Sequence, residues 1–449
     1  MVVGPTFIQT MDKRGEVPTL RKCALVVLAI NILSAVLFIA LVDRPVYDDY
    51  LHTFDLQNYA TRGLSAASLL QHKNAPGPTA YLWMATGVHL LPGSELRNAR
   101  IAILASWILL AAAFLVAARS SAFPEIWYGA LLAVLVFPHS VQAAATLLTE
   151  GPALLFAACG VIAWIRFLPS AAKTTGPLAL GILGGVSMGV ATTCRQYYLA
   201  LLPAAALFAG YHLLKLPAEQ RLRSSLKVSF SLFAACVPVA LLLLAWKNIA
   251  SPEMVTGTAY HHTATALVGL NLSRPIVAGF YVAIYLLPFT FPDMVRLTGW
   301  RFRVAAVSAV LVGAAVSYFN SFFLQPGPFS SSIQMVSRAR GTRLILFLFA
   351  SIVIFNALAV LSFIWNRRVL LGSRPPVCFA LLILVFFVAE QVGVGGNHPF
   401  YDRYVLQVAP FLGLIVFSLL PRLTLARVAV FLSLCCFSNY MLWRFAAAQ

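Results

Sequence analysis

The chain has 449 residues, of which 60% are hydrophobic and only 10% are charged, and its net charge is +18. In soluble globular domains about a quarter of the residues are charged, so this composition excludes a soluble fold. Lys and Arg stand in short clusters between apolar runs and form no basic domain with interleaved aromatic residues. This distribution argues against a nucleic-acid-binding protein.

Apolar runs of roughly 17 to 25 residues recur along almost the whole chain, which predicts an all-α polytopic membrane protein with about 12 or 13 transmembrane helices. The expected spans are 23–42, 99–118, 126–138, 150–168, 176–193, 197–213, 228–249, 276–291, 303–320, 344–365, 375–391, 404–420 and 425–442. The apolar stretch 78–91 is not counted, because about 14 residues suit an interfacial or re-entrant helix better than a crossing.

The basic residues of the loops orient these spans. Cytoplasmic loops retain Lys and Arg during insertion, so we place residues 1–22, which precede the first span, in the cytoplasm as an uncleaved N-terminus. With thirteen spans, 19 of the 32 Lys and Arg residues then face the cytoplasm. If residues 78–91 crossed the membrane, the densest basic loops would face outward, so the thirteen-span arrangement is preferred.

The acidic residues have the opposite distribution. Nine of the fourteen acids fall on the external side or at external helix ends: Asp43, Asp48, Asp49, Asp55, Glu95, Glu150, Glu253, Glu390 and Asp402. Acids contribute little to topology, so their gathering on one face needs another cause. Because several bases lie in the same loops, we expect an outward-facing site that combines carboxylates with cations.

The first external loop, residues 43–98, is the longest of the expected loops. In "YDDYLHTFDLQNYATRGL", Asp48, His52, Asp55 and Tyr59 recur at helical spacing and would form one face of a helix along the membrane surface. The "APGP" stretch breaks this helix, and "TAYLW" is an interfacial aromatic anchor. The loop is therefore expected to form membrane-surface helices that cover a lipid head group.

Several short motifs follow in a characteristic order. An acidic pair, Asp48 and Asp49, comes directly after the first span, followed by "HKNAPGPTAYLW", "GSELRNAR" and "TEGPALLF" at 149–156. This order resembles the GT-C superfamily of integral-membrane glycosyltransferases, above all the bacterial aminoarabinose transferase and protein mannosyltransferase relatives. The resemblance covers about the first 200 residues. "CRQYYLALLPA" from Cys194 and "GGNHPFYDRYVLQVAPFL" from Gly395 also resemble span openings in this superfamily, whereas many relatives have Glu in place of Asp49.

The resemblance implies a GT-C fold and a polyprenyl-phosphate-linked sugar as donor. It further implies that Asp48 is the general base for a hydroxyl acceptor in an inverting displacement. Asp49 would be its partner and would orient it or hold a cation, since two adjacent carboxylates repel. The alternative for the pair is structural, with one acid capping a helix and the other in its first turn, which stabilises a helix by about 0.5 to 2 kcal/mol.

Other residues of the external face are candidates for the same site. Arg and Lys suit a phosphate, and the candidates are Lys73, Arg195 and Arg403, although each could equally be an interfacial side chain that reaches toward water. The candidates for acceptor or metal contact are Glu150, His261, His262 and His398. Glu150 could instead be a first-turn helix acid, and the adjacent histidines a solvated loop pair. Asp49 and Glu150 are the candidate ligands if a divalent cation, Mg²⁺ or Mn²⁺, takes part.

The chain divides into a catalytic module at 23–213 and variable helices at 214–449 with external loops 250–275, 321–343 and 392–403. We expect a bacterial inner-membrane enzyme whose site faces the periplasm or exterior. A glycolipid, a glycan or a protein would be its acceptor. The alternatives are a lipid-linked oligosaccharide polymerase or ligase and a flippase-type transporter. The basic stretch "SRARGTR" at 337–343 favours the polymerase or ligase. The sugar, the acceptor, the metal requirement and the oligomeric state stay open.

Overall fold

The structure, a computed structural model, describes residues 16–46, 48–74, 77–171, 177–248, 251, 271–272, 274–290, 299–319, 342–366, 374–393, 402–419 and 424–447. Within these ranges the regular structure is helical and includes no strand. The expectation of an all-α chain is therefore confirmed.

The first half of the chain contains α1 (Glu16–Leu41), α2 (Asp49–Arg62), α3 (Ala66–Leu70), α4 (Pro78–Leu90), α5 (Glu95–Arg119), α6 (Pro124–Leu135), α7 (Ser140–Ala145), α8 (Glu150–Ala171), α9 (Leu178–Cys194), η2 (Gln196–Ala200) and α10 (Leu201–Leu214). The second half contains α11 (Ala218–Trp246), α14 (Arg274–Thr290), α15 (Gly299–Tyr318), α18 (Thr342–Asn366), α20 (Pro375–Glu390), η4 (Asp402–Val408), α21 (Ala409–Leu419) and α22 (Leu425–Ala447).

In the described part of the chain, seven helices are long and apolar enough to cross a membrane, and six shorter apolar helices accompany them. Each of the thirteen expected spans coincides with one of these helices. The largest differences at the helix starts are in α1, which begins at Glu16, and α11, which begins at Ala218, well before the expected 23 and 228. Hydropathy marks only the apolar part of a helix, whereas the hydrogen-bonded helix continues through the basic residues that precede it.

Small residues allow close packing of α9 between α8 and α11. Gly181, Gly185 and Gly189 recur every four residues on α9, and a Cβ atom at Gly185 would lie 2.2 Å from the backbone oxygen of Ser231 on α11. Such a spacing of small residues lets helix backbones approach each other in a membrane, where van der Waals packing drives association.

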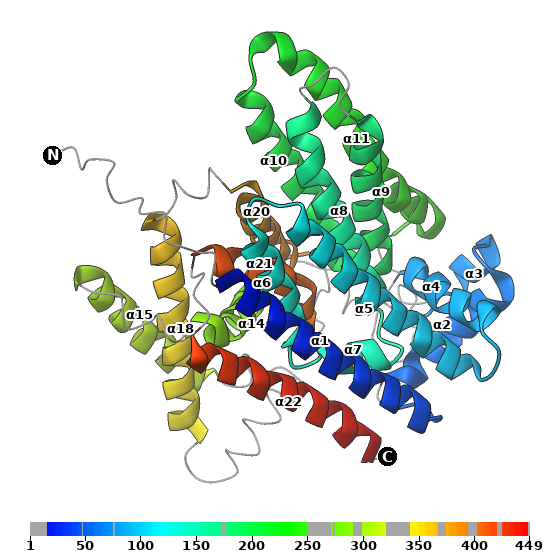
Figure 1. Ribbon diagram of the computed structural model, residues 1–449, viewed down its shortest axis with the longest axis horizontal. Coiled ribbons are helices and arrows are strands. Elements are labelled where there is room, and N and C mark those ends of the chain that lie inside the picture. Colours follow the sequence, from blue (N-terminus) through cyan, green and yellow to red (C-terminus); the bar gives the residue numbers. More distant parts are fainter. Residues whose placement is uncertain are drawn as a thin grey trace.

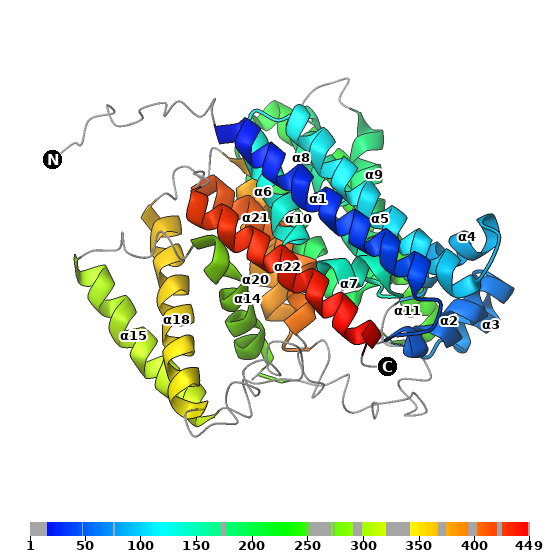
Figure 2. The same ribbon diagram turned by 60° about the horizontal axis from the view of Figure 1, so that its bottom comes forward.

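Polar side chains join α1 to α22, which run side by side in Figures 1 and 2. Asn31 on α1 donates from Nδ2 to the backbone oxygen of Leu135 at 2.8 Å and accepts from Asn439 on α22 at 3.3 Å. Further along, Trp443 donates from Nε1 to the Ser34 hydroxyl at 3.3 Å. Buried hydrogen bonds of this kind hold membrane helices together where lipid is as apolar as the side chains.

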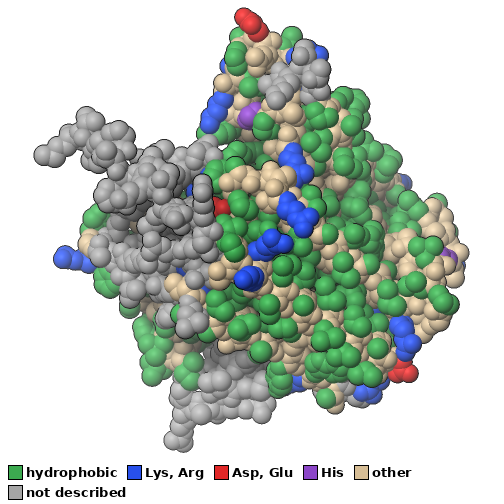
Figure 3. Space-filling view, viewed as in Figure 1, with side chains coloured by type: hydrophobic (Ala, Val, Ile, Leu, Met, Phe, Trp, Pro, Cys, Tyr) green, Lys and Arg blue, Asp and Glu red, His purple; other side chains and the backbone are tan. Residues whose placement is uncertain are grey.

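Helices α15 and α18 pack on each other at one side of the molecule (Figures 1 and 2). Their outer side chains, such as Val307, Leu311 and Leu348, are exposed. Figure 3 shows hydrophobic side chains over most of the face in view, with Lys and Arg in small groups. A surface of this composition suits contact with lipid.

The first external loop folds into α2, α3 and α4, which lie together at the end of the bundle where α1 ends (Figure 1). Helix α4 has 13 residues and packs against α2 and α5. It is not among the helices that could cross a membrane. The expectation of helices in this loop is confirmed, and a non-spanning segment at 78–91 stays a prediction.

Candidate active site

Asp48 lies at the N-terminal end of α2, after a non-helical stretch that contains Pro45. Its side chain makes no capping hydrogen bond to α2. Instead, Asp48 Oδ2 accepts a hydrogen bond from Arg403 Nη1 on η4, and the Asp48 side chain is 20% exposed. The carboxylate is thus directed toward a cation and toward solvent, not toward its own helix.

Asp49 lies in a different environment and is only 1% exposed. Its Oδ2 accepts from Arg100 Nη2 at 2.5 Å and from the Val46 N–H at 3.1 Å, and its Oδ1 accepts from the Leu147 N–H at 2.6 Å. Arg100 on α5 also donates to the backbone oxygen of Arg44 at 2.8 Å. The cation beside Asp49 is therefore a buried guanidinium, and the contacts of Asp49 join the segment between α1 and α2 to α5 and to the segment between α7 and α8.

Glu150 and Arg195 form a second buried ion pair. Glu150 is the first residue of α8, and Arg195 is an extended residue between α9 and η2. Arg195 Nη2 donates to Glu150 Oε1 at 2.6 Å, while Glu150 Oε2 is buried without a hydrogen-bond partner among the described residues. Arg195 thus neutralises a carboxylate whose burial would otherwise be costly.

The pairs Asp48–Arg403 and Glu150–Arg195 act on each other electrostatically. Burial by itself raises the pKa of Asp48, but Arg403, then His52 and, more weakly, Arg195 hold this pKa below its ordinary value. Helix α8 also contacts η4. Side chains from four segments far apart in the chain therefore gather at one end of the bundle, where the Asp48 carboxylate lies near two arginines.

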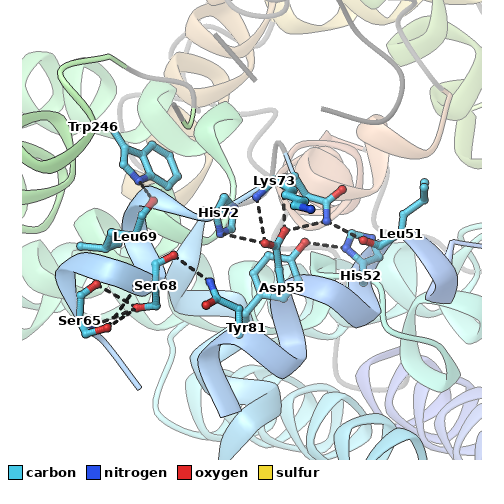
Figure 4. Close-up of polar contacts among 12 residues, drawn as sticks. Leu51, His52, Asp55, Ser65, Ser68, Leu69, His72, Lys73, Tyr81 and Trp246 are labelled. Atoms are coloured by element: carbon cyan, nitrogen blue, oxygen red, sulfur yellow. Dashed lines mark hydrogen bonds and ion pairs between the residues drawn. The ribbon is translucent and has the colours of Figure 1, made fainter. Parts of the chain in front are cut away.

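Asp55 organises the loop that covers this cluster (Figure 4). Its carboxylate is fully buried and accepts from the N–H groups of Lys73 and Asn74 at 2.9 Å each and from Asn74 Nδ2 at 2.7 Å. His52, Asp55 and Tyr59 all lie on the buried face of α2. The helical face expected from the sequence is present, and its polar side chains are buried in the protein.

Gly77 brings α4 against the end of α9. Its N–H donates to the Cys194 oxygen at 2.9 Å, and a Cβ atom at Gly77 would lie 1.9 Å from the Thr193 oxygen. The hydroxyls of Thr79 and Thr193 are 2.8 Å apart. Only glycine allows this approach, which places the loop directly beside Arg195.

The remaining predicted residues lie elsewhere or outside the described ranges. Lys73 was predicted to bind phosphate. Its ammonium lies 3.6 Å above the ring of Phe54, whose electron-rich face attracts the positive charge. His261, His262 and His398 lie outside the described residues, as do nearly all of loops 250–275 and 321–343.

The structure adds residues that were not predicted. Arg274, at the start of α14, donates from Nη2 to the Tyr197 hydroxyl at 3.0 Å and from Nε to Gln391 Oε1 at 3.1 Å. The ring of Tyr197 packs on Tyr404 at 4.8 Å, next to Arg403. Arg274, Tyr197 and Tyr404 thus form a chain of contacts that reaches the residue next to Arg403. "CRQYY" and "DRY" contain the two tyrosines, but their contact depends on the tertiary structure.

Asp49 and Glu150, the predicted ligands of a divalent cation, already have partners within the protein. Mg²⁺ and Mn²⁺ prefer carboxylate oxygens, but both oxygens of Asp49 accept hydrogen bonds, and one oxygen of Glu150 faces Arg195. The described residues contain no group of three His, Cys, Asp or Glu side chains that could hold a metal ion. The donors in this part of the chain do not fit such a site, and the proposed reaction is built from side chains alone.

Fold and site together define a polytopic helical membrane protein in which surface helices cover a buried cluster of acids and arginines. No protein-family model matches the chain, and no curated protein matches it in sequence.

Among solved structures, the chain is similar to ArnT from Cupriavidus metallidurans. The match to the apo state has 16% identity and a TM-score of 0.40 and covers 92% of this chain and 76% of that one. The match to the state bound to undecaprenyl phosphate has 16% identity and a TM-score of 0.41, with coverages of 93% and 77%.

The chain is also similar to the S. cerevisiae protein O-mannosyltransferase Pmt1-Pmt2 complex bound to the sugar donor, at 15% identity and a TM-score of 0.40. That match covers 57% of this chain but only 37% of the yeast chain, well under two thirds of its length. The likeness concerns the arrangement of the helices.

Proposed function

We propose that this chain is a membrane glycosyltransferase that moves a sugar from a polyprenyl-phosphate-linked donor to a hydroxyl acceptor. The observation that carries the proposal is the partly exposed Asp48 carboxylate, which is paired with Arg403 and lies near Arg195. A transfer of this kind needs a general base for the hydroxyl and cations for the departing phosphate. The cluster offers both at a membrane-facing loop.

In the proposed reaction, Asp48 accepts the proton of the acceptor hydroxyl while the hydroxyl oxygen bonds to the anomeric carbon. The bond from that carbon to the donor phosphate oxygen breaks, and its electron pair leaves with the lipid phosphate. Arg195 and Arg403 neutralise the phosphate charge. Because attack and departure take place on opposite faces, the anomeric carbon is inverted. A phosphate leaves without protonation, so the acid and base pair of glycoside hydrolysis is not required.

Arg403 has two roles in this scheme. In the absence of substrate it binds Asp48 and favours the ionised carboxylate, which keeps the carboxylate a weak base. When Arg403 binds the donor phosphate in place of Asp48, Asp48 loses its neighbouring cation and its pKa rises. The base would therefore become stronger when the donor is in place.

We place the site on the outer face of a bacterial inner membrane, because every segment that forms it is an external loop in the positive-inside arrangement. The acceptor is then a hydroxyl of a glycolipid, a glycan or a protein on that face. Arg403 belongs to the C-terminal half, so the catalytic part extends beyond the expected module at 23–213. The polymerase or ligase alternative rested on "SRARGTR", most of which lies outside the described residues.

Mass spectrometry of envelope lipids, glycans and glycoproteins from cells with and without the gene tests this function. We expect the deletion strain to lose one hexose, pentose or aminosugar from one acceptor class and to regain it when the wild-type gene is restored. A deletion strain whose envelope glycans and lipids are unchanged would contradict the proposal. Because the missing sugar remains on its donor lipid, the lipid-linked sugar should accumulate in the same extracts.

A further inference from the structure

His52 is a buried histidine beside the acid and arginine cluster. It follows Asp48 by one helical turn on α2 and is 4% exposed. Its imidazole lies within electrostatic range of Asp48, Arg195, Glu150 and Arg403. The proposed reaction leaves this side chain without a role, although it is one helical turn from the base and within electrostatic range of both arginines.

Tyr81 on α4 fixes the orientation of the His52 ring, as Figure 4 shows. The Tyr81 hydroxyl and His52 Nδ1 are 2.7 Å apart, and both side chains are buried. Burial raises the pKa of Tyr81 well above its ordinary value, so the phenol keeps its proton. Burial also lowers the pKa of His52 to about 4, so the imidazole is neutral at physiological pH.

The tautomer of His52 follows from this contact. A buried O–H group without an acceptor costs about 1–3 kcal/mol, so the Tyr81 hydroxyl must donate to a neighbour. Asn74, another polar neighbour, directs its Nδ2 group to the Leu51 oxygen and to Asp55 Oδ2, and the hydrogen bond of the Tyr81 hydroxyl is to His52 Nδ1. Among the described residues, this leaves His52 Nδ1 as the acceptor of the Tyr81 proton. The hydrogen of the neutral imidazole is then on Nε2.

The position of His52 indicates what this N–H group binds. In a direct displacement, the acceptor oxygen and the leaving phosphate oxygen lie on opposite faces of the anomeric carbon. His52 is one helical turn from the base and within electrostatic range of the phosphate-binding arginines, which is the region where the sugar ring would lie between them. A neutral N–H donor suits a sugar hydroxyl, which has lone pairs and no charge, better than it suits a phosphate.

We propose that Tyr81 holds His52 as the neutral Nε2–H tautomer and that His52 donates from Nε2 to a hydroxyl oxygen of the sugar being transferred. This assignment rests on the proposed glycosyltransferase function. His52 would be a sugar-binding residue, and Tyr81 a positioning residue that acts through His52.

The tautomer can be tested without any activity. The protein has eight histidines, so the His52 signals of ¹⁵N-histidine-labelled protein in lipid nanodiscs can be assigned by difference from His52→Gln. At pH 6 and pH 7 we expect a protonated Nε2 and an unprotonated Nδ1, and we expect Tyr81→Phe to convert this signal to a tautomer mixture. A charged imidazolium at pH 6, or a protonated Nδ1, would overturn the assignment.

The sugar contact is tested by comparing transfer with lipid binding. In His52→Phe we expect transfer to fall about tenfold, as for the loss of one hydrogen bond in the transition state. Binding of undecaprenyl phosphate, which has no sugar, should stay within about twofold of wild type. His52→Gln retains an N–H donor and should recover much of the transfer, and the exposed His89→Gln is the matched control.

The outcomes separate the two proposals. Full transfer by His52→Phe would refute the sugar contact alone. Loss of undecaprenyl phosphate binding in that variant would assign His52 to the phosphate or to the fold and refute it as well. A wild-type protein that transfers no sugar would refute the glycosyltransferase function and, with it, any sugar contact of His52.

Discussion

Asp48 and Asp49 are neighbours in the chain, but the fold gives their carboxylates different surroundings. Asp48 is partly exposed and shares its charge with Arg403, whereas Asp49 is buried and accepts hydrogen bonds from Arg100 and two backbone N–H groups. A carboxylate whose oxygens are all bound inside the protein cannot receive a proton from a substrate. The base role is therefore proposed for Asp48, and Asp49 holds the loop that carries it.

Loss of Arg100 should destabilise the protein. In Arg100→Met, Asp49 becomes a buried charge without its cation, which costs about 3–5 kcal/mol. The thermal midpoint of the purified protein, followed by tryptophan fluorescence, should fall clearly. The double variant Asp49→Asn, Arg100→Met should recover part of this loss. An unchanged midpoint in Arg100→Met would show that the pair does not hold the loop.

The pH dependence of transfer depends on Arg403. The pKa of Asp48 is lowered in the folded protein. Its carboxylate therefore remains ionised as the pH falls and becomes protonated only below the ordinary value of 3.8. The kcat/KM of the wild type for the donor, which reports the free enzyme in which Arg403 still binds Asp48, should therefore vary little between neutral pH and about pH 5. In Arg403→Gln the raising effect of burial is less opposed, so the acid limb of the rate profile should move to higher pH.

The measurement is the pH at which kcat/KM for the donor is half-maximal in each variant, so that a lower absolute rate does not affect the comparison. Arg97→Gln, which removes an exposed arginine at the start of α5, is the control and should have the wild-type profile. An acid limb that stays in place in Arg403→Gln would argue against control of Asp48 by Arg403.

The sequence predicted which of these side chains share a face, but not their partners. Asp48, Glu150, Arg195 and Arg403 were all expected on the external side, and the structure brings them together. Asp49 and Arg100 are far apart in the chain, so their pairing depends on tertiary packing. One signal was available, because Arg100 lies inside an expected span, where a charge without a partner is costly.

At the scale of the elements, α2, α3 and α4 form a cover whose position depends on the contact of Gly77 with α9. Gly77→Ala would place a Cβ atom 1.9 Å from the Thr193 oxygen, so the backbone must move. We expect a loss of about 1–3 kcal/mol in stability, together with reduced transfer.

Gly210→Ala is the matched control for Gly77→Ala. Gly210 lies within α10, and a Cβ atom there would meet nothing within 4 Å. Alanine at this position should stabilise the helix by about 0.5–1 kcal/mol. Thermal midpoints of the two variants that shift in the same direction would contradict the account of Gly77.

Hydropathy located the helices well because crossing a bilayer imposes both their length and their apolar composition. It also kept α4 apart from the expected spans, and α4 is in neither group of apolar helices. It placed the starts of α1 and α11 too late, since helical hydrogen bonds continue into basic segments. Short helices such as α7 were not predicted, because six residues leave no recognisable period.

At the scale of the whole molecule, the site exists only because external segments far apart in the chain meet at one end of the bundle. This arrangement predicts opposite accessibility for two exposed glutamines, Gln57 on α2 and Gln220 on α11. In a cysteine-free background, a membrane-impermeant maleimide added to spheroplasts should label Gln57→Cys and not Gln220→Cys. Lysed membranes should be labelled at both positions. The reverse pattern would contradict the topology and the outer-face site.

The central claim is that Asp48 is the base for sugar transfer, and its most direct test is the transfer rate of Asp48→Asn. This variant keeps the size of the side chain and removes its proton-accepting charge, so transfer should fall by about 10²- to 10⁴-fold. Membrane insertion and elution as a single species should be unchanged, and Asp43→Asn, an exposed acid of the same loop, should transfer at the wild-type rate. Wild-type transfer by a correctly inserted Asp48→Asn protein would contradict the account.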